Sequence, residues 1–427
     1  MPEQPMTLGE QDSRYIWHPY TQMKSAPPAI PMVRGKEALL FDEQDNAYLD
    51  AISSWWVNLH GHGNPYIAQK IFEQACTLEH CIFAGFTHPQ AIRLALRLLT
   101  ILPGKMTRVF YSDNGSTAVE VALKMAIQYW RNKGIQKSRI LALRHAYHGD
   151  TFGAMSVSGR SVFNQVFADY LFQVDYTQIP SNDNPVEDHH PSEYAAVIFE
   201  PLIQGSGGML MHEAADLNRF IRYCRSQGML IIADEVMTGF GRTGKTFAMD
   251  HVEEYADMIC LSKGITGGTM AMGVTACNQS VFEAFLSEDR TRTLFHGHSY
   301  TANPIACAAA NASLDLLESP DCQDNILRIS KLHADFRLQI QDHPAIRNLR
   351  QTGTILAFEM DTGQPDSYTN PIRDSLYDFF LRRRIILRPL GNTLYLMPPY
   401  CITNAQLEQV YQAIRELLEV HREKVPQ

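Results

Sequence analysis

The chain has 427 residues, 45% of them hydrophobic, and a formal net charge of −9 at pH 7. This length exceeds that of a usual single domain and supplies enough apolar residues for a large core, so we expect two domains. The acidic balance and the lack of a basic run argue against nucleic acid or an anionic membrane surface as the main partner. The composition is that of an ordinary soluble enzyme.

Eight cysteines are scattered along the chain without a Cys-x-x-Cys pair. Several lie in apolar segments, where a thiol packs as a small hydrophobic group, and this pattern indicates a reducing compartment. The first residues, Met-Pro-Glu-Gln-Pro, lack a basic region followed by an apolar core, and no apolar run is long enough to span a membrane. We therefore expect a cytoplasmic protein.

The first 60 residues mix loop signals with one hairpin, predicted over 38–50, where Asp and Asn residues suit a turn between two short apolar strands. From about residue 107, short apolar runs are separated by segments long enough to hold helices or extended loops. This repetition predicts an α/β fold with a mostly parallel central sheet covered by helices, and with ligands at the carboxyl ends of the strands. The predicted strands are 108–111, 140–143, 195–199, 229–233, 258–261 and 272–276.

After about residue 320, helix-like stretches alternate with apparent strands at 354–359 and 393–397. The capping-box pattern Thr403-Asn-Ala-Gln406 and the apolar residues after it predict the last helix. The stretch 180–191, rich in Pro, Asn and Asp, is predicted to be a surface loop. The predicted division is an N-terminal segment that joins the small α+β domain and the active site (1–60), a large cofactor-binding domain (61–320) and a C-terminal small domain (321–427).

One lysine and one aspartate follow separate apolar strands. Lys263 lies in the run 257–268, where a strand delivers it into a glycine-rich turn, and Asp234 ends an apolar strand that begins near residue 228. A lysine held in a dry, tight turn loses hydration, which leaves the neutral amine that a Schiff base requires. The carboxylate can keep a pyridine nitrogen protonated, so that the ring accepts electrons from a substrate carbanion. The pair suggests pyridoxal 5′-phosphate (PLP) as the cofactor, although each residue alone also fits a surface lysine or a turn-capping carboxylate.

The segments around this pair resemble a known family, the class III aminotransferases of PLP fold type I. The resemblance is carried by Phe199–Gly205, Asp234-Glu-Val236, Gly239–Gly244 and Ser262-Lys-Gly264. It implies that Lys263 holds PLP as an aldimine and then acts as general base and acid in a ping-pong transamination, with Asp234 at the pyridine nitrogen. It also implies a smaller α+β domain built from the N- and C-terminal segments. From the spacing alone, racemase or decarboxylase chemistry on the same scaffold stays open.

A strand-to-helix junction predicts the phosphate site. The run 111–120 leads into a helix predicted over 117–133, so the amides near Gly115 and Ser116 lie at the helix N-terminus. Free N–H groups and the positive end of the helix dipole bind anions, and the Ser116 hydroxyl adds a donor. Simple capping by Asn114 or Ser116 explains the same residues. The resemblance favours the phosphate site, because the family has Gly-Ser or Gly-Thr at this point.

The same resemblance assigns the walls of the cofactor site. Tyr147 occupies the place of the aromatic residue that stacks on the pyridine ring and excludes water. Val236, two residues past Asp234, is predicted on the same side of its strand and therefore against the other face of the ring. Glu200 resembles an acid that lies behind the cofactor.

The stretch 294–304 resembles a segment that reaches across a dimer interface to the partner's phosphate. Ser299 stands at its hydroxyl position, and Gly297 is a candidate substrate contact. The family members considered next usually have Gly-Pro-Thr here, whereas this chain has Gly297-His-Ser299. The resemblance implies a homodimer whose active site is shared between the subunits.

Three segments, 16–23, 53–62 and 387–399, narrow the substrate. They resemble family members that aminate 8-amino-7-oxononanoate in biotin biosynthesis with S-adenosylmethionine as the amino donor. Such a keto acid needs an apolar tunnel with a cation at its end, and Arg388 fits because a guanidinium can bind a carboxylate through two parallel hydrogen bonds. Lysine as the donor, and an ω-amino acid or diamine aminotransferase, stay open. The predicted walls are Tyr20, Trp55 and Tyr147, with Trp56 beside them.

One pattern points to a different class of protein. Residues 239–246 satisfy G-x-x-x-x-G-K-[ST], the phosphate loop of P-loop NTPases. In those proteins the acidic strand that holds magnesium lies elsewhere, whereas here the strand ending in Asp234 and Glu235 enters the loop, and no convincing helix follows it. An NTPase is kept as a distant alternative. The histidines form no His-Glu-x-x-His pattern and have no cysteines at zinc spacing, so we predict no metal and assign them loop or supporting roles.

Overall fold

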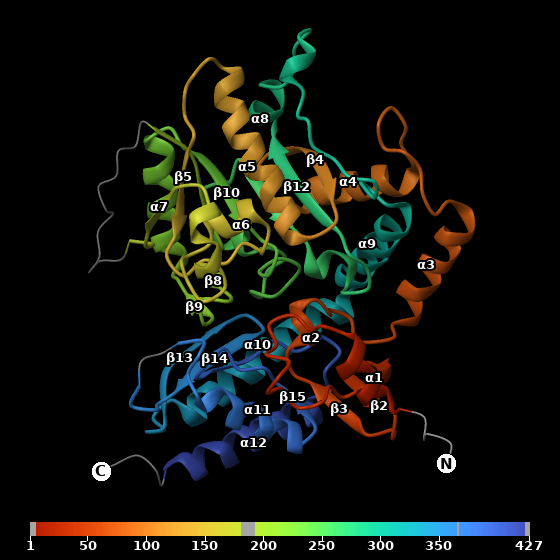
Figure 1. Cartoon of the computed structure of the whole chain (residues 1–427), viewed down its shortest axis with the longest axis vertical. Coiled ribbons are helices and arrows are strands. Elements are labelled where there is room, and N and C mark those ends of the chain that lie inside the picture. Colours follow the sequence, from red (N-terminus) through yellow and green to blue (C-terminus); the bar gives the residue numbers. More distant parts are fainter. Residues whose placement is uncertain (1–5, 181–192, 365–366, 423–427) are drawn as a thin grey trace.

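The computed structural model describes residues 6–180, 193–364 and 367–422. A large region with a central sheet occupies the upper half of Figure 1, and the N- and C-terminal segments, in red and blue, lie together in the lower half. The predicted surface loop at 180–191 lies almost wholly outside the described residues. No helix within the described ranges is both long enough and apolar enough to cross a membrane.

The central sheet has seven strands in the order β4-β12-β11-β10-β7-β5-β6. The five strands from β11 to β6 run parallel, and β12 is antiparallel to both of its neighbours. All six predicted strands are present and the prediction of a mostly parallel sheet is confirmed, but β6 at the sheet edge was missed because its short run contains an aspartate. The strands are β4 (Met106–Ser112), β5 (Arg139–Leu143), β6 (Val174–Thr177), β7 (Tyr194–Phe199), β10 (Leu230–Asp234), β11 (Met258–Leu261) and β12 (Gly273–Asn278).

Helices cover both faces of this sheet, which explains why its strands are almost continuously apolar. In β5, Ile140 and Ala142 face one core while Leu141 and Leu143 face the other. Each isoleucine or leucine among them contributes about 1.5–3 kcal/mol of stability when fully buried. The first core includes α5 (Gly115–Asn132), α6 (Phe152–Val157) and α8 (Gln279–Glu283), and the second includes α4 (Pro89–Ile101), α7 (Ala214–Ser226) and α9 (Pro304–Leu317).

The lower region joins the two ends of the chain. The predicted hairpin is confirmed as β2 (Leu39–Asp42) and β3 (Ala47–Asp50), which pair antiparallel. On its other edge β3 pairs in parallel with β15 (Ile385–Ile386), so one four-stranded sheet, completed by β1 (Met32–Lys36), contains residues from both ends. This pairing fits a small domain built from the N- and C-terminal segments.

A second small sheet lies beside it, with β14 (Ile355–Met360) between β13 (Ile346–Thr352) and β16 (Thr393–Leu396). The predicted start of the last helix is confirmed, because the Thr403 N–H donates to Gln406 Oε1 at 2.9 Å and the Gln406 N–H donates to Thr403 Oγ1 at 3.2 Å. The division of the chain at residues 60 and 320 stays a prediction. The remaining helices are α1 (Leu8–Tyr15), the irregular α2 (Ser53–Trp56), α3 (Pro65–Thr77), α10 (Pro320–Ile340), α11 (Ile372–Arg382) and α12 (Asn404–Arg422).

Candidate active site

A cavity of about 460 Å³ opens at the carboxyl ends of the central strands, where the strand pattern predicted the ligand site. Its floor comes from residues that directly follow β7, β10 and β11, and its sides come from the N-terminus of α5, the loop after β5 and the irregular segment α2. The predicted residues that line it are Trp55, Trp56, Gly115, Ser116, Tyr147, Glu200, Asp234, Val236 and Lys263.

Lys263 enters this cavity from a constrained turn. It follows β11 and begins a short 3₁₀ helix, Lys263–Thr266, with a backbone φ of 45°, which is rare for a residue with a side chain. Two residues of the same turn, Gly267 and Gly268, also have positive φ. Burial lowers the pKa of the Lys263 ammonium, and the negative charges of Asp234 and Glu200 oppose this effect. The turn therefore holds the amine in place and favours its neutral form, as the sequence suggested.

Asp234, the last residue of β10, is buried and held from two directions. Its Oδ2 accepts the Nδ1–H of His148 at 2.6 Å, and its Oδ1 accepts the Val236 N–H at 3.1 Å. His148 is in turn fixed by its own N–H, which donates to Ser158 Oγ at 2.9 Å. A pyridinium N–H in the cavity would meet a carboxylate that is already oriented. Sequence reasoning assigned His148 only a loop or supporting role, and its position directly after Tyr147 was the signal for this contact.

Glu200 lies deeper in the same cavity. It follows β7, is 5% exposed, and its Oε2 is buried without a hydrogen-bond partner among the described residues. Burial and the negative charge of Asp234 raise its pKa well above the ordinary value. This shift widens the pH range over which Glu200 is protonated and can donate a hydrogen bond to a ligand.

The N-terminus of α5 offers an anion site. Asn114 caps the helix, because its side chain accepts the Thr117 N–H at 2.9 Å, and this leaves the N–H groups of Gly115 and Ser116 for a ligand. A Cβ on Gly115 would lie 2.7 Å from Cγ1 of Val236, so only glycine fits there. Ser116 Oγ accepts the Asp150 N–H at 3.2 Å, and its own proton stays available. Capping and anion binding are thus divided between neighbouring residues.

Val236 lines the cavity for a different reason from the one predicted. Strand β10 ends at Asp234, and Val236 lies in the turn that follows, where its N–H is bonded to the Asp234 carboxylate. The prediction that it projects from the strand was therefore wrong, whereas its place in the cavity wall is as expected.

The substrate side of the cavity is aromatic. The hydroxyls of Tyr20 and Tyr147 lie 3.0 Å apart, and the Tyr20 hydroxyl also donates to Asp150. Burial and the bond to Asp150 raise the pKa of Tyr20 to about 12, so the phenol stays protonated at ordinary pH. The Tyr20 ring lies 5.7 Å from the ring of Trp55. Sequence reasoning missed Asp150, whose place three residues after Tyr147 on one loop was the available signal.

Arg388 stands beside this wall. Its guanidinium carbon lies 4.7 Å above the centre of the Trp55 ring, a cation–π contact that fixes the direction of the charge. Trp56, which is 7% exposed, packs into the core, and its Nε1–H donates to the Tyr395 hydroxyl at 2.9 Å. Lys263 Nζ lies 5.0 Å from the centre of the Trp56 ring. Tyr395 was missed because only the fold brings β16 next to α2.

Four predicted residues do not line this cavity. Tyr20 and Arg388 stand outside its lining, next to Tyr147 and Trp55, and Gly297 and Ser299 lie on a separate segment. The predicted action of Gly297 and Ser299 across a dimer interface does not require them to line the cavity of their own chain. Within the described ranges, no cluster of three or more His, Cys, Asp and Glu side chains could hold a metal ion.

The loop 239–246 is not built like a nucleotide-binding loop. After it comes only a 3₁₀ helix of four residues, Ala248–His251, and not a long helix whose N-terminus could face phosphates. The loop serves packing instead, because the fully buried Arg242 donates to the carbonyls of Pro398 at 3.0 Å and Asn58 at 3.1 Å. These contacts argue against the NTPase alternative.

The fold and the parts of the cavity are those of a fold type I, PLP-dependent aminotransferase. The family model of the class-III aminotransferases matches residues 20–418, and the chain belongs to this family. The adenosylmethionine-8-amino-7-oxononanoate aminotransferase of Synechococcus elongatus is 46% identical over 420 residues, which cover 95% of this chain and 98% of that protein. The aminotransferase class also removes the racemase and decarboxylase alternatives.

Solved structures agree. The crystal structure of adenosylmethionine-8-amino-7-oxononanoate aminotransferase from Methanocaldococcus jannaschii is 35% identical and superposes with a TM-score of 0.91, covering 96% of this chain and 98% of that chain. An amine transaminase from an uncultivated Pseudomonas species, solved with PLP bound as an internal aldimine, is 29% identical with a TM-score of 0.86, covering 94% and 97%.

The residues present fit PLP. Each functional group of this cofactor has a partner in the cavity. The carboxylate of Asp234 suits the ring N–H, and the amides of Gly115 and Ser116 suit the phosphate. The amine of Lys263 suits the aldehyde. The buried Glu200 Oε2 and His148 Nε2 have no partner among the described residues, as expected of a pocket shaped for a polar ligand. The cofactor of this aminotransferase is PLP.

Proposed function

We propose that this enzyme transfers an amino group from S-adenosylmethionine to 8-amino-7-oxononanoate, a step of biotin biosynthesis. Both relatives named above with this activity align over nearly the full length of the chain. The observation that carries the proposal is the chain of contacts from Arg388 over Trp55 to Tyr20 and Tyr147, because Trp55 and Tyr147 line the cavity that Lys263 enters. Such a wall suits a long acceptor with an apolar chain and a distant carboxylate.

The proton transfers are assigned to Lys263. PLP supplies an electron sink for the carbanion that forms when a substrate carbon loses its proton. The Nζ of Lys263, whose pKa burial lowers, would take this proton from the substrate carbon and would then release it as the general acid. Asp234, held by His148 and the Val236 N–H, keeps the ring nitrogen protonated. In our proposal Tyr147 and Val236 enclose the ring and exclude water.

The acceptor carries an ammonium beside its ketone and a carboxylate at its far end. We assign the ammonium to Asp150, which lies three residues after Tyr147 and accepts the Tyr20 hydroxyl. The carboxylate is assigned to Arg388, which is half-buried and can offer two parallel N–H groups. Trp55 and Tyr20 form the apolar walls between them. Donor and acceptor use the site in turn, which gives ping-pong kinetics.

We further propose a homodimer in the cytoplasm. The segment around Ser299 exposes Phe295 and Tyr300 by 71% and 65%, and Phe72 and Phe86 are 69% and 68% exposed. Large exposed aromatics in such number are typical of interaction surfaces. A second copy could bring Ser299 to the phosphate and Gly297 to the substrate, as the family resemblance implies. All eight cysteines are free, which fits a reducing compartment.

The absorption spectrum of the purified holoenzyme tests the proposal. Addition of S-adenosylmethionine alone should convert the yellow, PLP-bound form to the pyridoxamine form, and later addition of 8-amino-7-oxononanoate should restore it. Bleaching by lysine or a diamine, but not by S-adenosylmethionine, would replace the donor and keep the aminotransferase. Failure of 8-amino-7-oxononanoate to restore the yellow form would refute the acceptor.

A further inference from the structure

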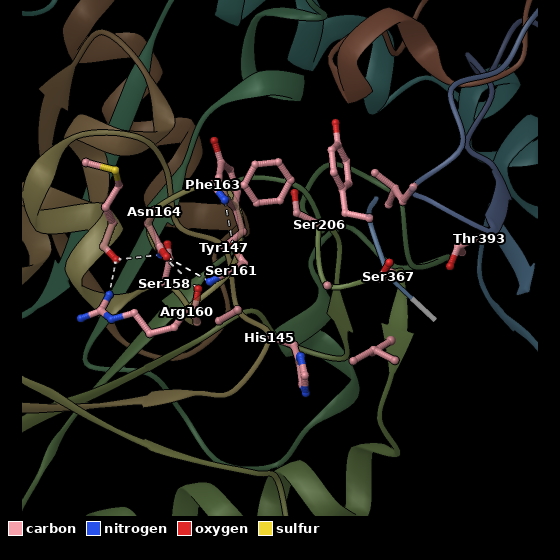
Figure 2. A pocket seen from close by; sticks show the side chains of 18 of the residues that line it. His145, Tyr147, Ser158, Arg160, Ser161, Phe163, Asn164, Ser206, Ser367 and Thr393 are labelled. Atoms are coloured by element: carbon pink, nitrogen blue, oxygen red, sulfur yellow. Dashed lines mark hydrogen bonds between the residues drawn. The ribbon is translucent and has the colours of Figure 1, made fainter. Parts of the chain in front are cut away.

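A second cavity lies next to the cofactor cavity, and of the residues used in the mechanism above only Tyr147 and Asp150 line it. Its volume is about 330 Å³, within the range of about 300–1,000 Å³ of small-molecule pockets. Tyr147 and Gly149 line both cavities, so the two are neighbours across one tyrosine. In Figure 2, Phe163 and Tyr147 lie on one side of this second cavity, and Ser367 and Thr393 lie on the other. It therefore lies between the large region and the C-terminal one.

An unsatisfied carboxylate oxygen lines this cavity. Glu359 of β14 is 4% exposed, and one of its oxygens, Oε1, pairs with Arg350 NH2 at 2.7 Å. The other, Oε2, is buried and has no hydrogen-bond partner in the part of the chain that the structure describes. A buried acceptor without a donor is costly, so a ligand that brings hydroxyl donors would be stabilised here. The hydroxyls of a ribose are donors of this kind, and an acidic residue binds them in many nucleotide sites.

Aromatic rings form another wall of the same cavity. Phe163 contacts Tyr368 with a centroid distance of 4.6 Å, and it lies 6.0 Å from Tyr147. Aromatic side chains are sequence-tolerant platforms for nucleic acid bases, because every base has a π face. Phe163 follows α6 in the large region, and Tyr368 belongs to the C-terminal region, so the pair also closes one side of the space between the two regions.

The position of Arg388 separates this cavity from the far end of the acceptor. The acceptor ends in a carboxylate, which we assign to Arg388, and Arg388 is not among the residues that line the second cavity. A donor that carries a nucleoside instead brings ribose hydroxyls, which can donate to the Glu359 oxygen that Arg350 leaves unpaired. The positive sulfonium of S-adenosylmethionine would pass the face of Tyr147, where a cation is attracted to the ring.

We propose that the second cavity binds the purine nucleoside of a sulfonium amino donor, with Glu359 at the ribose hydroxyls and Phe163 and Tyr368 beside the base. This inference rests on the proposed function and deepens it, because it gives donor and acceptor separate subsites beyond a shared reacting centre. Glu359, Phe163 and Tyr368 are thus specificity residues of the donor half-reaction.

The test measures the two half-reactions separately on the intact holoenzyme. Glu359→Gln should raise the S-adenosylmethionine concentration for half-maximal bleaching by about 10-fold or more, as expected for loss of a hydrogen bond to a charged group. The return reaction with 8-amino-7-oxononanoate should stay within about twofold of the wild type. Glu416→Gln is a matched control, since Glu416 pairs with Arg383 on the exposed surface of α12 and should change neither half.

Glu359→Gln also disturbs the ion pair with Arg350, so a second measurement changes the donor instead. In the wild type, half-maximal bleaching by S-adenosylmethionine analogues that lack the 2′- or the 3′-hydroxyl should require about 10-fold more donor than with S-adenosylmethionine. In Glu359→Gln the analogues and S-adenosylmethionine should require the same concentration. Phe163→Leu should likewise weaken the donor half alone. The subsite is overturned if removing a donor hydroxyl raises the required concentration equally in the wild type and in Glu359→Gln. It is also overturned if the substitutions affect both half-reactions equally.

The outcomes separate this inference from the proposed function. A wild-type enzyme that S-adenosylmethionine does not bleach, although lysine does, refutes the donor and the nucleoside subsite with it. A wild-type enzyme that S-adenosylmethionine bleaches, with Glu359→Gln and Phe163→Leu unchanged in that half-reaction, overturns only the subsite and leaves the proposed function intact.

Discussion

The floor and the rim of the active site are built in different ways. The floor is built at the ends of three neighbouring strands of one sheet. Asp234 is the last residue of β10, Glu200 directly follows β7, and Lys263 lies two residues after β11, and all three line the cavity. On the rim, Tyr20 and Trp55 are 42% and 44% exposed and come from loops near the N-terminus. The floor holds the groups assigned to chemistry on rigid elements, and the rim holds those assigned to substrate choice on loops.

The rim carries strain that the floor mostly avoids. Ser53, Ser54 and Trp56 all have positive φ, and each such residue costs of the order of 1–3 kcal/mol. The buried Asp50 holds this turn, because it accepts the N–H groups of Ile52 at 3.1 Å and Ser54 at 2.7 Å. The strained path lets adjacent tryptophans, Trp55 and Trp56, both line the cavity. Local preference alone would place them on opposite sides.

The largest effect on turnover is expected from a substitution on the floor of the active site. Lys263→Ala should lower turnover by about 1,000-fold or more, because it removes the amine that moves the proton. The protein should still fold and hold the cofactor, since the phosphate and ring contacts stay. Turnover and the absorption spectrum report the two properties separately. Lys245→Ala is the control, since Lys245 is exposed and bonds only to the Asp250 carbonyl in the described chain; an active Lys263→Ala enzyme would contradict the assignment.

A smaller loss is expected from Asp234→Asn. The amide keeps the shape of the carboxylate and can still accept the Val236 N–H, but it removes the charge that stabilises a protonated ring nitrogen. Turnover should fall by about 100-fold or more. Asp216→Asn, which alters a half-buried carboxylate paired with the exposed Arg219 far from this chemistry, should leave turnover near that of the wild type. Near-normal turnover of Asp234→Asn would remove the electron-sink role.

The rim is tested by Arg388→Ala. The KM for the long keto acid should rise by about 10- to 100-fold, because a charged hydrogen-bonded pair contributes about 1.5–3 kcal/mol. Half-reactions with short amine donors should survive, since they do not reach Arg388. Arg383→Ala, at an exposed arginine paired with Glu416, should leave the KM for the keto acid unchanged. If Arg388→Ala weakens short amines and the long keto acid alike, the distinction between floor and rim fails at this residue.

The smallest effect concerns the stability of the apoprotein. Burial lowers the folded-state pKa of Lys263 below its ordinary 10.5, so below that pH the unfolded chain binds a proton that the folded chain resists. The contribution of Lys263 to stability therefore improves as pH rises toward 10.5. Lys263→Met should be more heat-stable than the wild type at about pH 7.5, and the difference in Tm should shrink by about pH 10. A difference that is constant with pH would contradict the lowered pKa.

The chain itself determined most of the floor. Apolar runs ending in Asp234 and Ser262-Lys263 predicted adjacent buried strands, and the run into 117–133 predicted the helix whose N-terminus offers its amides. These features are local, because strand periodicity, glycine-rich turns and helix capping act between residues that are close in the chain. The family resemblance then supplied their roles. His148 was given only a loop or supporting role, because its place after Tyr147 does not by itself name Asp234, on another strand, as its partner.

Only the tertiary structure decided the rim and the second cavity. Arg388 meets Trp55, and Tyr395 meets Trp56, across most of the length of the chain, through the pairing of β3 with β15 and the packing of β16 near α2. Glu359 became a candidate only when its second oxygen proved to be buried and without a partner among the described residues. Residue type and local pattern fix secondary structure. The burial of a side chain, its orientation and its unsatisfied hydrogen bonds depend instead on which distant segments pack together. Because these three properties define the substrate contacts, only the tertiary structure could reveal them.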